Sequence, residues 1–336
     1  MKFITTLNKL LEIDFPLIMA PMFLVSNESM MKSAIDGGVM GVFPTLNYRN
    51  KGELAAIISK LHQYRNEKKG TGNFGVNLIV QKSNPLFEEH LEICVAEKVP
   101  YYITSLGSPA EVIRQGHAYG AKVFCDVTNL KHAEKCAGLG CDGFIAVGLG
   151  AGGHAGPNPL TVLIPALHQK FPSIPVVAAG GVATGAGMIS MLALGAAGVS
   201  VGTRFIASTE AQVSEEYKKA IVDSEMDDIV LTERLSGTPC AIIDTPYAKK
   251  IGYRQNWFEK QFSKNTTTRK YFKMLVQVQG MKKLEAAVKP GNYNNLWCAG
   301  KSVELIHDIL PCSQIISNFE KEMTASWQDL KSSFKE

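Results

Sequence analysis

The first two-thirds of the chain alternates between short apolar runs and longer segments in which apolar residues recur every three or four positions. The short runs end in glycine or polar residues, which is typical of strands. Their continuous apolarity indicates strands that are covered on both faces, as in a parallel sheet. The eight runs are Leu17–Met22, Gly38–Thr45, Phe74–Val80, Tyr101–Gly107, Lys122–Thr128, Cys141–Gly148, Ile174–Gly181 and Gly198–Phe205.

The segments between these runs predict helices, and several begin with a residue that favours a helix start. They are Asn27–Asp36, Asn84–Glu97, Pro109–Tyr119, Asn129–Leu139, Pro159–Lys170 and Thr184–Leu194. Strands that alternate with helices predict parallel βαβ units, and eight units are the number in a (β/α)8 barrel. A doubly wound sheet is the rival, but it usually has fewer strands and an early glycine fingerprint, whereas these glycines cluster late. We therefore predict an α/β fold with a TIM-type barrel over residues 1–210.

The rhythm changes after the predicted barrel. Residues 211–296 are richer in charged and aromatic residues and show helical spacing without regular strands, except for one short extended piece within Met226–Cys240. This predicts an inserted, mostly helical cap domain at the barrel mouth, in which Tyr247, Tyr253 and Trp257 have no assignable role. Residues 297–336 are predicted to return to the barrel, with a helical stretch over Val303–Leu310 and a terminal amphipathic helix over Ile315–Phe334.

Composition narrows the class of protein. The chain has 336 residues, 46% of them hydrophobic, which is enough for a large core. Its 35 basic and 31 acidic residues give a formal net charge of only +4, without a sustained basic stripe, so we expect no nucleic-acid partner. No apolar run is long enough for a transmembrane helix, and the first residues lack the features of a signal peptide. We expect no membrane partner and a cytoplasmic location, and a homodimer is left open.

Cysteine usage agrees with a reducing compartment. The seven cysteines are scattered, and no Cys-x-x-Cys pair occurs. We therefore expect neither a zinc site nor a disulfide framework, and no metal.

Two of the late strands end in glycines that predict a phosphate site. Gly180 and Gly181 end the seventh run, with Thr184 at the start of the next helix, and Gly202 and Thr203 lie in the eighth run. Backbone N–H groups at such positions bind anions, and barrels often bind phosphate after strands seven and eight. Tight turns alone are the alternative explanation for the glycines. We predict a phosphorylated cofactor held at these strand ends.

One histidine stands apart from the others. His154 follows Gly152 and Gly153 in a glycine-dense loop after the sixth run, whereas the other six histidines fall on helical segments. An imidazole can donate or accept a hydrogen bond and can exchange a proton near neutral pH. We predict that His154 is catalytic and that Gly152 and Gly153 contact the cofactor.

Three further features lie at strand ends. The amide of Asn77 interrupts an apolar strand and offers two donors and one acceptor to a flavin ring edge, although a buried structural amide is the alternative. Ala20, Pro21 and Met22 end the first run and could contact an aromatic ring or simply pack in the core. Asp126, at the end of the fifth run, could contact cofactor or substrate, or could cap the following helix.

Five segments, taken together and in this order, resemble the nitronate monooxygenase family, formerly called 2-nitropropane dioxygenases. They are Pro16–Met22, Gly75–Leu78, Ala151–Gly156, Ala178–Val182 and Gly202–Phe205. The resemblance implies a TIM-type barrel with non-covalent FMN and a helical cap domain, and it places His154 at the face of the flavin. The residues that it implies around the FMN are Asn77, Gly152, Gly181, Ser200, Gly202 and Thr203.

The same motifs occur in FMN-dependent enoyl-ACP reductases and NADH:quinone reductases. Many nitronate monooxygenases also carry Gln and Glu in the loop before Gly-Gly-His, where this chain has Val147 and Gly150. The resemblance favours FMN-dependent oxidation of alkyl nitronates by O2. An NAD(P)H-dependent FMN reductase that acts on quinones or enoyl thioesters is the alternative, and a barrel that binds a phosphorylated metabolite without redox chemistry is the third.

Overall fold

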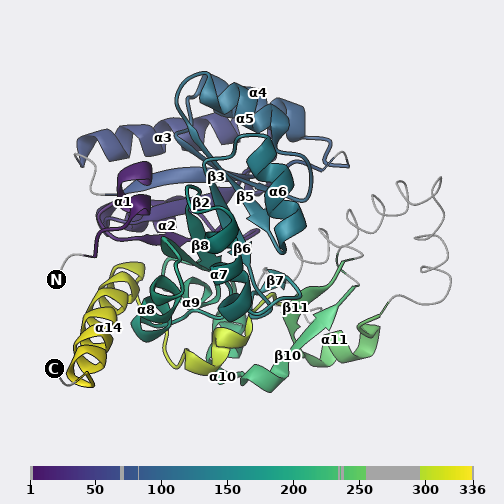
Figure 1. Ribbon diagram of the computed structural model, residues 1–336. Helices are drawn as coiled ribbons and strands as arrows, with labels where there is room; N and C mark the ends of the chain where they lie inside the picture. The colour runs from purple at the N-terminus through teal and green to yellow at the C-terminus, as the bar shows by residue number, and fades with distance from the viewer. Residues whose placement is uncertain are drawn as a thin grey trace.

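A computed structural model describes residues 3–68, 72–81, 83–233, 235, 238–254 and 296–334. Eight parallel strands form a closed barrel in the order β1-β2-β3-β4-β5-β6-β8-β9 (Figure 1). Each predicted run coincides with one of them, so the predicted (β/α)8 barrel is confirmed. The strands are β1 (Leu17–Met19), β2 (Met40–Pro44), β3 (Asn73–Ile79), β4 (Tyr101–Ser105), β5 (Lys122–Val127), β6 (Gly143–Val147), β8 (Val176–Ala179) and β9 (Gly198–Val201).

Helices surround the barrel, and three of the predicted starts are capped as expected. Asn27, Asn129 and Thr184 each accept a hydrogen bond from a backbone N–H in the first turn of the helix that follows. The eighth predicted strand ends earlier than expected, because the chain enters a short helix at Thr203. The helices are α1 (Thr6–Leu11), α2 (Glu28–Asp36), α3 (Glu53–Glu67), α4 (Phe87–Ala96), α5 (Ala110–His117), α6 (Leu130–Gly138), α7 (Leu160–Lys170), α8 (Gly185–Ala193) and α9 (Thr203–Ile206).

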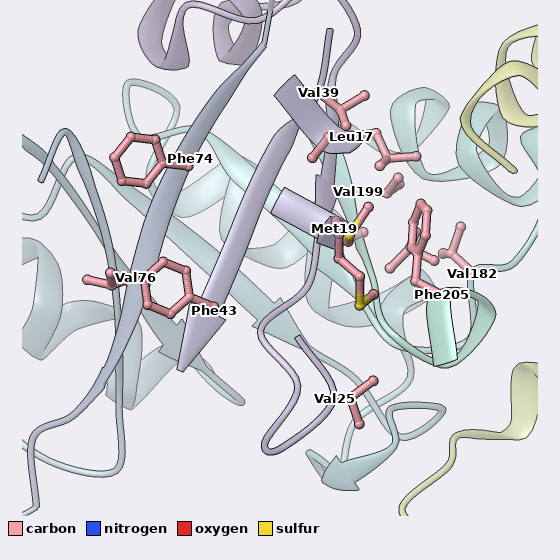
Figure 2. Close-up of a cluster of buried hydrophobic side chains, with 14 of the residues drawn as sticks. Leu17, Met19, Val25, Val39, Phe43, Phe74, Val76, Val182, Val199 and Phe205 are labelled. Atoms are coloured by element: carbon pink, nitrogen blue, oxygen red, sulfur yellow. The ribbon is translucent and has the colours of Figure 1, made fainter. Parts of the chain in front are cut away.

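The core has an outer and an inner layer because successive strand residues point to opposite faces. Outward residues such as Leu17, Met19 and Phe74 pack beneath the surrounding helices (Figure 2). Inward residues such as Ile18 and Phe124 fill the barrel together with residues of α1. Each fully buried side chain of this size contributes roughly 1.5–3 kcal/mol. The inner layer thus fills the barrel at the amino-terminal ends of the strands, and the carboxyl-terminal ends remain available for a site.

The region after β9 departs from the prediction. It contains α10 (Glu215–Asp223), a 3-10 turn (Met226–Asp228), β10 (Ile229–Thr232), β11 (Cys240–Ile243) and α11 (Pro246–Ile251). The short extended piece predicted within Met226–Cys240 is confirmed as β10. The expectation of no regular strands elsewhere is wrong, since β10 and β11 join a three-stranded antiparallel sheet with β7 (Gly153–His154). This pairing depends on a distant loop, so local spacing does not reveal it. Residues 255–295, with Trp257, lie outside the described residues.

The chain then returns to the barrel. The predicted helix over Val303–Leu310 is wrong: a 3-10 turn covers Lys301–Leu305, and extended chain follows. The predicted terminal helix is confirmed as α14 (Cys312–Ser332), which lies beside α8 (Figure 1). A Cβ at Gly185 would come within 2.2 Å of the Met323 nitrogen, so glycine permits this close approach.

None of the described helices is both long and apolar enough to cross a lipid bilayer.

Candidate active site

A cavity of about 1340 Å³ opens at the carboxyl ends of the barrel strands, where (β/α)8 barrels carry their active sites. Every residue predicted from the sequence for the site, except Thr184, lines it. The structure therefore brings together segments that are spread over almost two hundred residues. These lining residues are Ala20, Pro21, Met22, Asn77, Gly152, Gly153, His154, Gly180, Gly181, Ser200, Gly202 and Thr203.

The polar side chains at the cavity floor gather mainly on one side. Each barrel strand brings at least one residue near its carboxyl end to the cavity, and these include Ala20, Pro44, Asn77, Ser105, Asp126, Val147, Ala179 and Ser200. Asn77, Ser105 and Asp126, which we call the polar arc, come from the adjacent strands β3, β4 and β5. The strand order places β4 opposite β9 in the closed barrel, so the polar arc faces the β8–β9 edge.

The β8–β9 edge presents backbone rather than side chains, and we call Gly180, Gly181, Gly202 and Thr203 the glycine side. Gly180 and Gly181 have φ values of +110° and +79°, a region that favours glycine. A Cβ at Gly202 would meet no protein atom nearer than 3.7 Å. The N–H groups of Gly181 and Gly202 donate a hydrogen bond to no acceptor among the described residues. The Thr203 hydroxyl accepts a hydrogen bond from the Gly300 N–H at 3.0 Å and keeps its own proton to donate. This edge can bind an anion.

The predicted contribution of Thr184 to a phosphate site is wrong. The Thr184 hydroxyl accepts from the Gly187 N–H at 3.1 Å, and the Gly185 N–H donates to the Glu322 carboxylate of α14 at 2.8 Å. Thr184 does not line the cavity. A carboxylate already satisfies the positive end of α8, which leaves the glycine side as the candidate for the anion.

His154 lies on β7 rather than on a free loop. The register of β7 and β11 places His154 opposite Cys240, and Gly153 opposite Ala241. The imidazole is exposed to the cavity, while the surrounding walls limit its hydration, so burial lowers the pKa of His154. The neutral ring is therefore favoured at neutral pH, and it can both donate and accept a hydrogen bond.

The amide of Asn77 is fixed by its neighbours. Its Nδ2 donates to the backbone oxygen of Ile103 at 3.1 Å and to the Ser105 hydroxyl at 2.8 Å. The carbonyl of Ile103 can only accept, which assigns the nitrogen to that side. Both donors of Asn77 are thus used, and only its carbonyl oxygen remains as an acceptor. The expectation that this amide also offers donors to a ring is wrong for this arrangement.

Asp126 belongs to the same network. The Ser105 hydroxyl donates to Asp126 Oδ2 at 2.5 Å. Burial raises the pKa of Asp126 to about 6, although the bond from Ser105 acts in the opposite direction. Asn129 caps α6, so the capping alternative for Asp126 is wrong. Sequence reasoning missed Ser105; the signal available was a hydroxyl two positions after an inward apolar residue.

Close contacts explain why the loop after β6 has glycine at positions 150 and 152. A Cβ at Gly150 would lie 3.0 Å from the Gly181 Cα, and one at Gly152 would lie 2.8 Å from the Gly300 nitrogen. A larger residue at position 150 would therefore push on the glycine side. Val147 instead adds an apolar side chain to the cavity wall.

The region after β9 supplies the remaining wall of the cavity. Tyr217, Cys240 and Cys298 line this side. The Tyr217 hydroxyl donates to the Cys298 oxygen at 2.6 Å, and its ring stacks on Trp297 with centroids 5.4 Å apart. These contacts connect α10 to the segment that returns to the barrel and so fix the wall beside His154.

The family model named nitronate monooxygenase matches residues 47–322 of this chain. The chain belongs to the nitronate monooxygenase family. The resemblance seen in the sequence is thus confirmed, and the protein is a flavin-dependent oxidoreductase. A barrel without redox chemistry, the third alternative, does not agree with this membership.

Three relatives illustrate the range of the family. The structure of FabK from Thermotoga maritima superposes with a TM-score of 0.84 at 30% identity and covers 99% of this chain and 100% of that one. A (3aS,4S,5R,7aS)-5-hydroxy-7a-methyl-1-oxo-octahydro-1H-indene-4-carboxyl-CoA dehydrogenase from Mycobacterium tuberculosis is 29% identical over 253 residues, 75% of this chain and 69% of that protein. A probable nitronate monooxygenase from Staphylococcus aureus is 27% identical over 275 residues, 69% of this chain and 76% of that protein.

Proposed function

We propose that the protein is an FMN-dependent oxidoreductase that uses NADH or NADPH to reduce the carbon–carbon double bond of an α,β-unsaturated acyl thioester. The observation that carries this proposal is the cavity of about 1340 Å³. Pockets for one drug-sized ligand measure roughly 300–1,000 Å³, and FMN is a ligand of that size. The additional space suits a long substrate better than a nitronate of a few atoms.

The relatives add support for the thioester class. The name of the Mycobacterium tuberculosis relative ends in carboxyl-CoA dehydrogenase, so that protein acts on a CoA thioester. Reductases and dehydrogenases both transfer a hydride, in opposite directions. The structural likeness to FabK extends over 99% of the chain, including the residues that return to the barrel.

The groups around the cavity suit FMN in particular. The free N–H groups of Gly181 and Gly202 would hold its phosphate, and the Asn77 carbonyl would accept a hydrogen bond from a ring N–H on the opposite side. Val147 and Ala179 offer apolar surface to the ring. When bound, FMN supplies the hydride-transfer chemistry, which these side chains cannot provide.

His154 would bind the reacting end of the substrate. Its neutral imidazole, exposed to the cavity, would donate an N–H to the thioester carbonyl and stabilise the negative charge that develops there. The pairing of β7 with β11 would keep the ring in place. We further propose that residues 211–296 form a cap that excludes water, with the barrel in residues 1–210 and 297–336.

Nitronate oxidation by O2 is the second candidate, and the family match favours it. In that reaction His154 would hydrogen-bond the nitro oxygens or remove the α-proton of a neutral nitroalkane. The two candidates differ in the electron donor, which gives a direct test.

An anaerobic visible spectrum of the FMN-loaded protein makes this test, with NADH, NADPH and ethylnitronate added separately and crotonyl-CoA added afterwards. We expect a nicotinamide nucleotide to bleach the flavin band and crotonyl-CoA to restore it. Bleaching by ethylnitronate alone would contradict the reductase and support the monooxygenase. A protein that binds no FMN would contradict both.

A further inference from the structure

Asp126 is the carboxyl group that reaches deepest into the cavity. Among the described residues, only Asp126 and Glu134 bring a carboxylate to the cavity lining. Glu134 lies on α6 and forms an ion pair with Lys170, away from the strand ends. Asp126 instead projects from the carboxyl end of β5, on the same floor as Asn77 and Ser105.

The hydrogen bonds of Asp126 leave one of its oxygens available. Its Oδ2 accepts from Ser105, while no described residue hydrogen-bonds to Oδ1. Ser105 is in turn oriented by the amide of Asn77, which donates to its hydroxyl at 2.8 Å. The chain of bonds from β3 to β5 thus fixes one carboxyl oxygen and leaves the other to the cavity.

No described cation forms an ion pair with Asp126, although Arg49, His132 and Lys135 line other parts of the same cavity. Its burial is not offset by an ion pair with any residue that the structure describes. The titratable groups that feel its charge are Tyr101 on β4 and Cys136 on α6, and the pKa of each is raised. His154 lines the same cavity from β7. A carboxyl group in such a setting holds a proton nearer to neutral pH than an exposed one does, which suits a general acid.

We infer that Asp126 is a catalytic acid of this enzyme, and that its carboxyl group, held by Ser105, delivers a proton to the α-carbon of an unsaturated acyl thioester. This inference rests on the proposed function and deepens it. It assigns a role to a residue for which the sequence left two alternatives.

The double bond between the α- and β-carbons loses its π pair; the hydride from the reduced cofactor forms a C–H bond at the β-carbon, and the π pair takes the Asp126 proton at the α-carbon. The substrate gains two electrons and two hydrogens in total. Asp126 becomes a carboxylate and recovers its proton from water. Ser105 is a positioning residue, since it acts through Asp126.

Variants separate the acid from its hydrogen bonds. Asp126→Asn keeps an oxygen that accepts from Ser105 but carries no acidic proton. We expect NAD(P)H to bleach the flavin in this variant at the wild-type rate, and crotonyl-CoA to reoxidise it about 10²–10⁴-fold more slowly, the usual contribution of general acid catalysis. Asp36→Asn, at the exposed end of α2, is the matched control and should change neither rate.

The pH dependence gives a second signature. The rate of reoxidation by crotonyl-CoA in the wild type should fall as the pH rises above about 6, because Asp126 loses its proton. In Asp126→Asn the rate should be low and flat over the same range. In D2O, the wild type should place deuterium at the α-carbon of the product.

Carbon-13 NMR of the Asp126 carboxyl in the FMN-loaded protein tests the inference without turnover. We expect a pKa near 6 in the wild type and a higher pKa in Ser105→Ala, because the lost bond favoured the carboxylate. The inference would be overturned if crotonyl-CoA reoxidised the flavin of Asp126→Asn at the wild-type rate. A pKa near 4 for the Asp126 carboxyl in the wild type would also overturn it. A wild-type flavin that NAD(P)H never reduces would instead contradict the proposed function.

Discussion

The two sides of the cavity are built in different ways. The glycine side, at β8 and β9, offers backbone N–H groups that positive φ values and missing side chains bring to the surface. The polar arc, at β3 to β5, offers side chains that orient one another through hydrogen bonds. The first arrangement suits a phosphate, because backbone N–H groups can bind an anion without any particular side chain. The second suits a reaction that needs a particular acid or acceptor.

This difference separates binding from chemistry. Damage to the glycine side should remove the cofactor, while damage to the polar arc should leave the cofactor bound and change what it does. Variants on each side of the cavity test that separation.

Gly180→Ala should cause the largest loss of FMN binding. The added Cβ would lie 2.6 Å from the Ala151 nitrogen, at a φ of +110°. The backbone must therefore shift, and we expect FMN affinity to fall by about 100-fold or more, measured by fluorescence titration; this corresponds to about 2.7 kcal/mol. Gly120→Ala is the matched control, because Gly120 has a φ of +90° but no atom within 4 Å of the added Cβ. Equal FMN affinity in the two variants would contradict the role of the glycine side.

His154→Ala should retain FMN and lose most turnover. The imidazole faces the cavity, and β11 holds its backbone, so the fold does not depend on the ring. We expect kcat to fall roughly 10²–10⁴-fold with an unchanged flavin spectrum. His117→Ala, on the exposed end of α5, controls for loss of a histidine in general. Unchanged turnover of His154→Ala would end its catalytic assignment.

Asn77→Ala should have an intermediate effect. It removes the Asn77 carbonyl, which the polar arc would offer to a ring N–H, and it leaves Ser105 without its orienting donor. A hydrogen bond is worth about 0.5–1.5 kcal/mol, so we expect FMN affinity to fall by roughly 2- to 13-fold. Asn318→Ala on α14 is the control for an amide outside the cavity. A loss as large as that of Gly180→Ala would show that the two sides do not differ in the proposed way.

The smallest expected effect concerns stability. The pKa of Asp126 is raised to about 6 in the folded protein, above the ordinary value of 3.8. A raised carboxyl pKa penalises the folded state once pH exceeds the unfolded value, and the full penalty applies above about pH 6. Asp126→Asn should therefore raise the Tm of the FMN-free protein by a few degrees at pH 8 and by less at pH 4. A lower Tm at pH 8 would show that the Asp126 charge is stabilised by other groups.

The barrel could be predicted because its signals are local. Each strand is a continuous apolar run, and helices such as α2 and α6 begin at side chains that cap them. The glycine side could also be predicted, since positive φ values demand glycine in the sequence itself. Helix α3 was not among the predicted helices, although Leu54, Ile57, Ile58 and Leu61 recur at helical spacing.

The polar arc could be predicted only in part, because it depends on contacts between strands. Ser105 lies 28 residues after Asn77 and 21 before Asp126, and nothing local links the three. The same holds for β7, whose pairing with β11 joins two loops far apart in the sequence. The error at Thr184 has a similar origin, since the partner of that helix start is Glu322, 137 residues away from Gly185.

The structure of the FMN-bound protein would show whether the glycine side holds the phosphate and the polar arc holds the ring. We predict the phosphate at the N–H groups of Gly181 and Gly202, and the ring against the Asn77 carbonyl with Asp126 facing the substrate space. A phosphate at the start of α8, or a ring that lies away from the polar arc, would contradict the account.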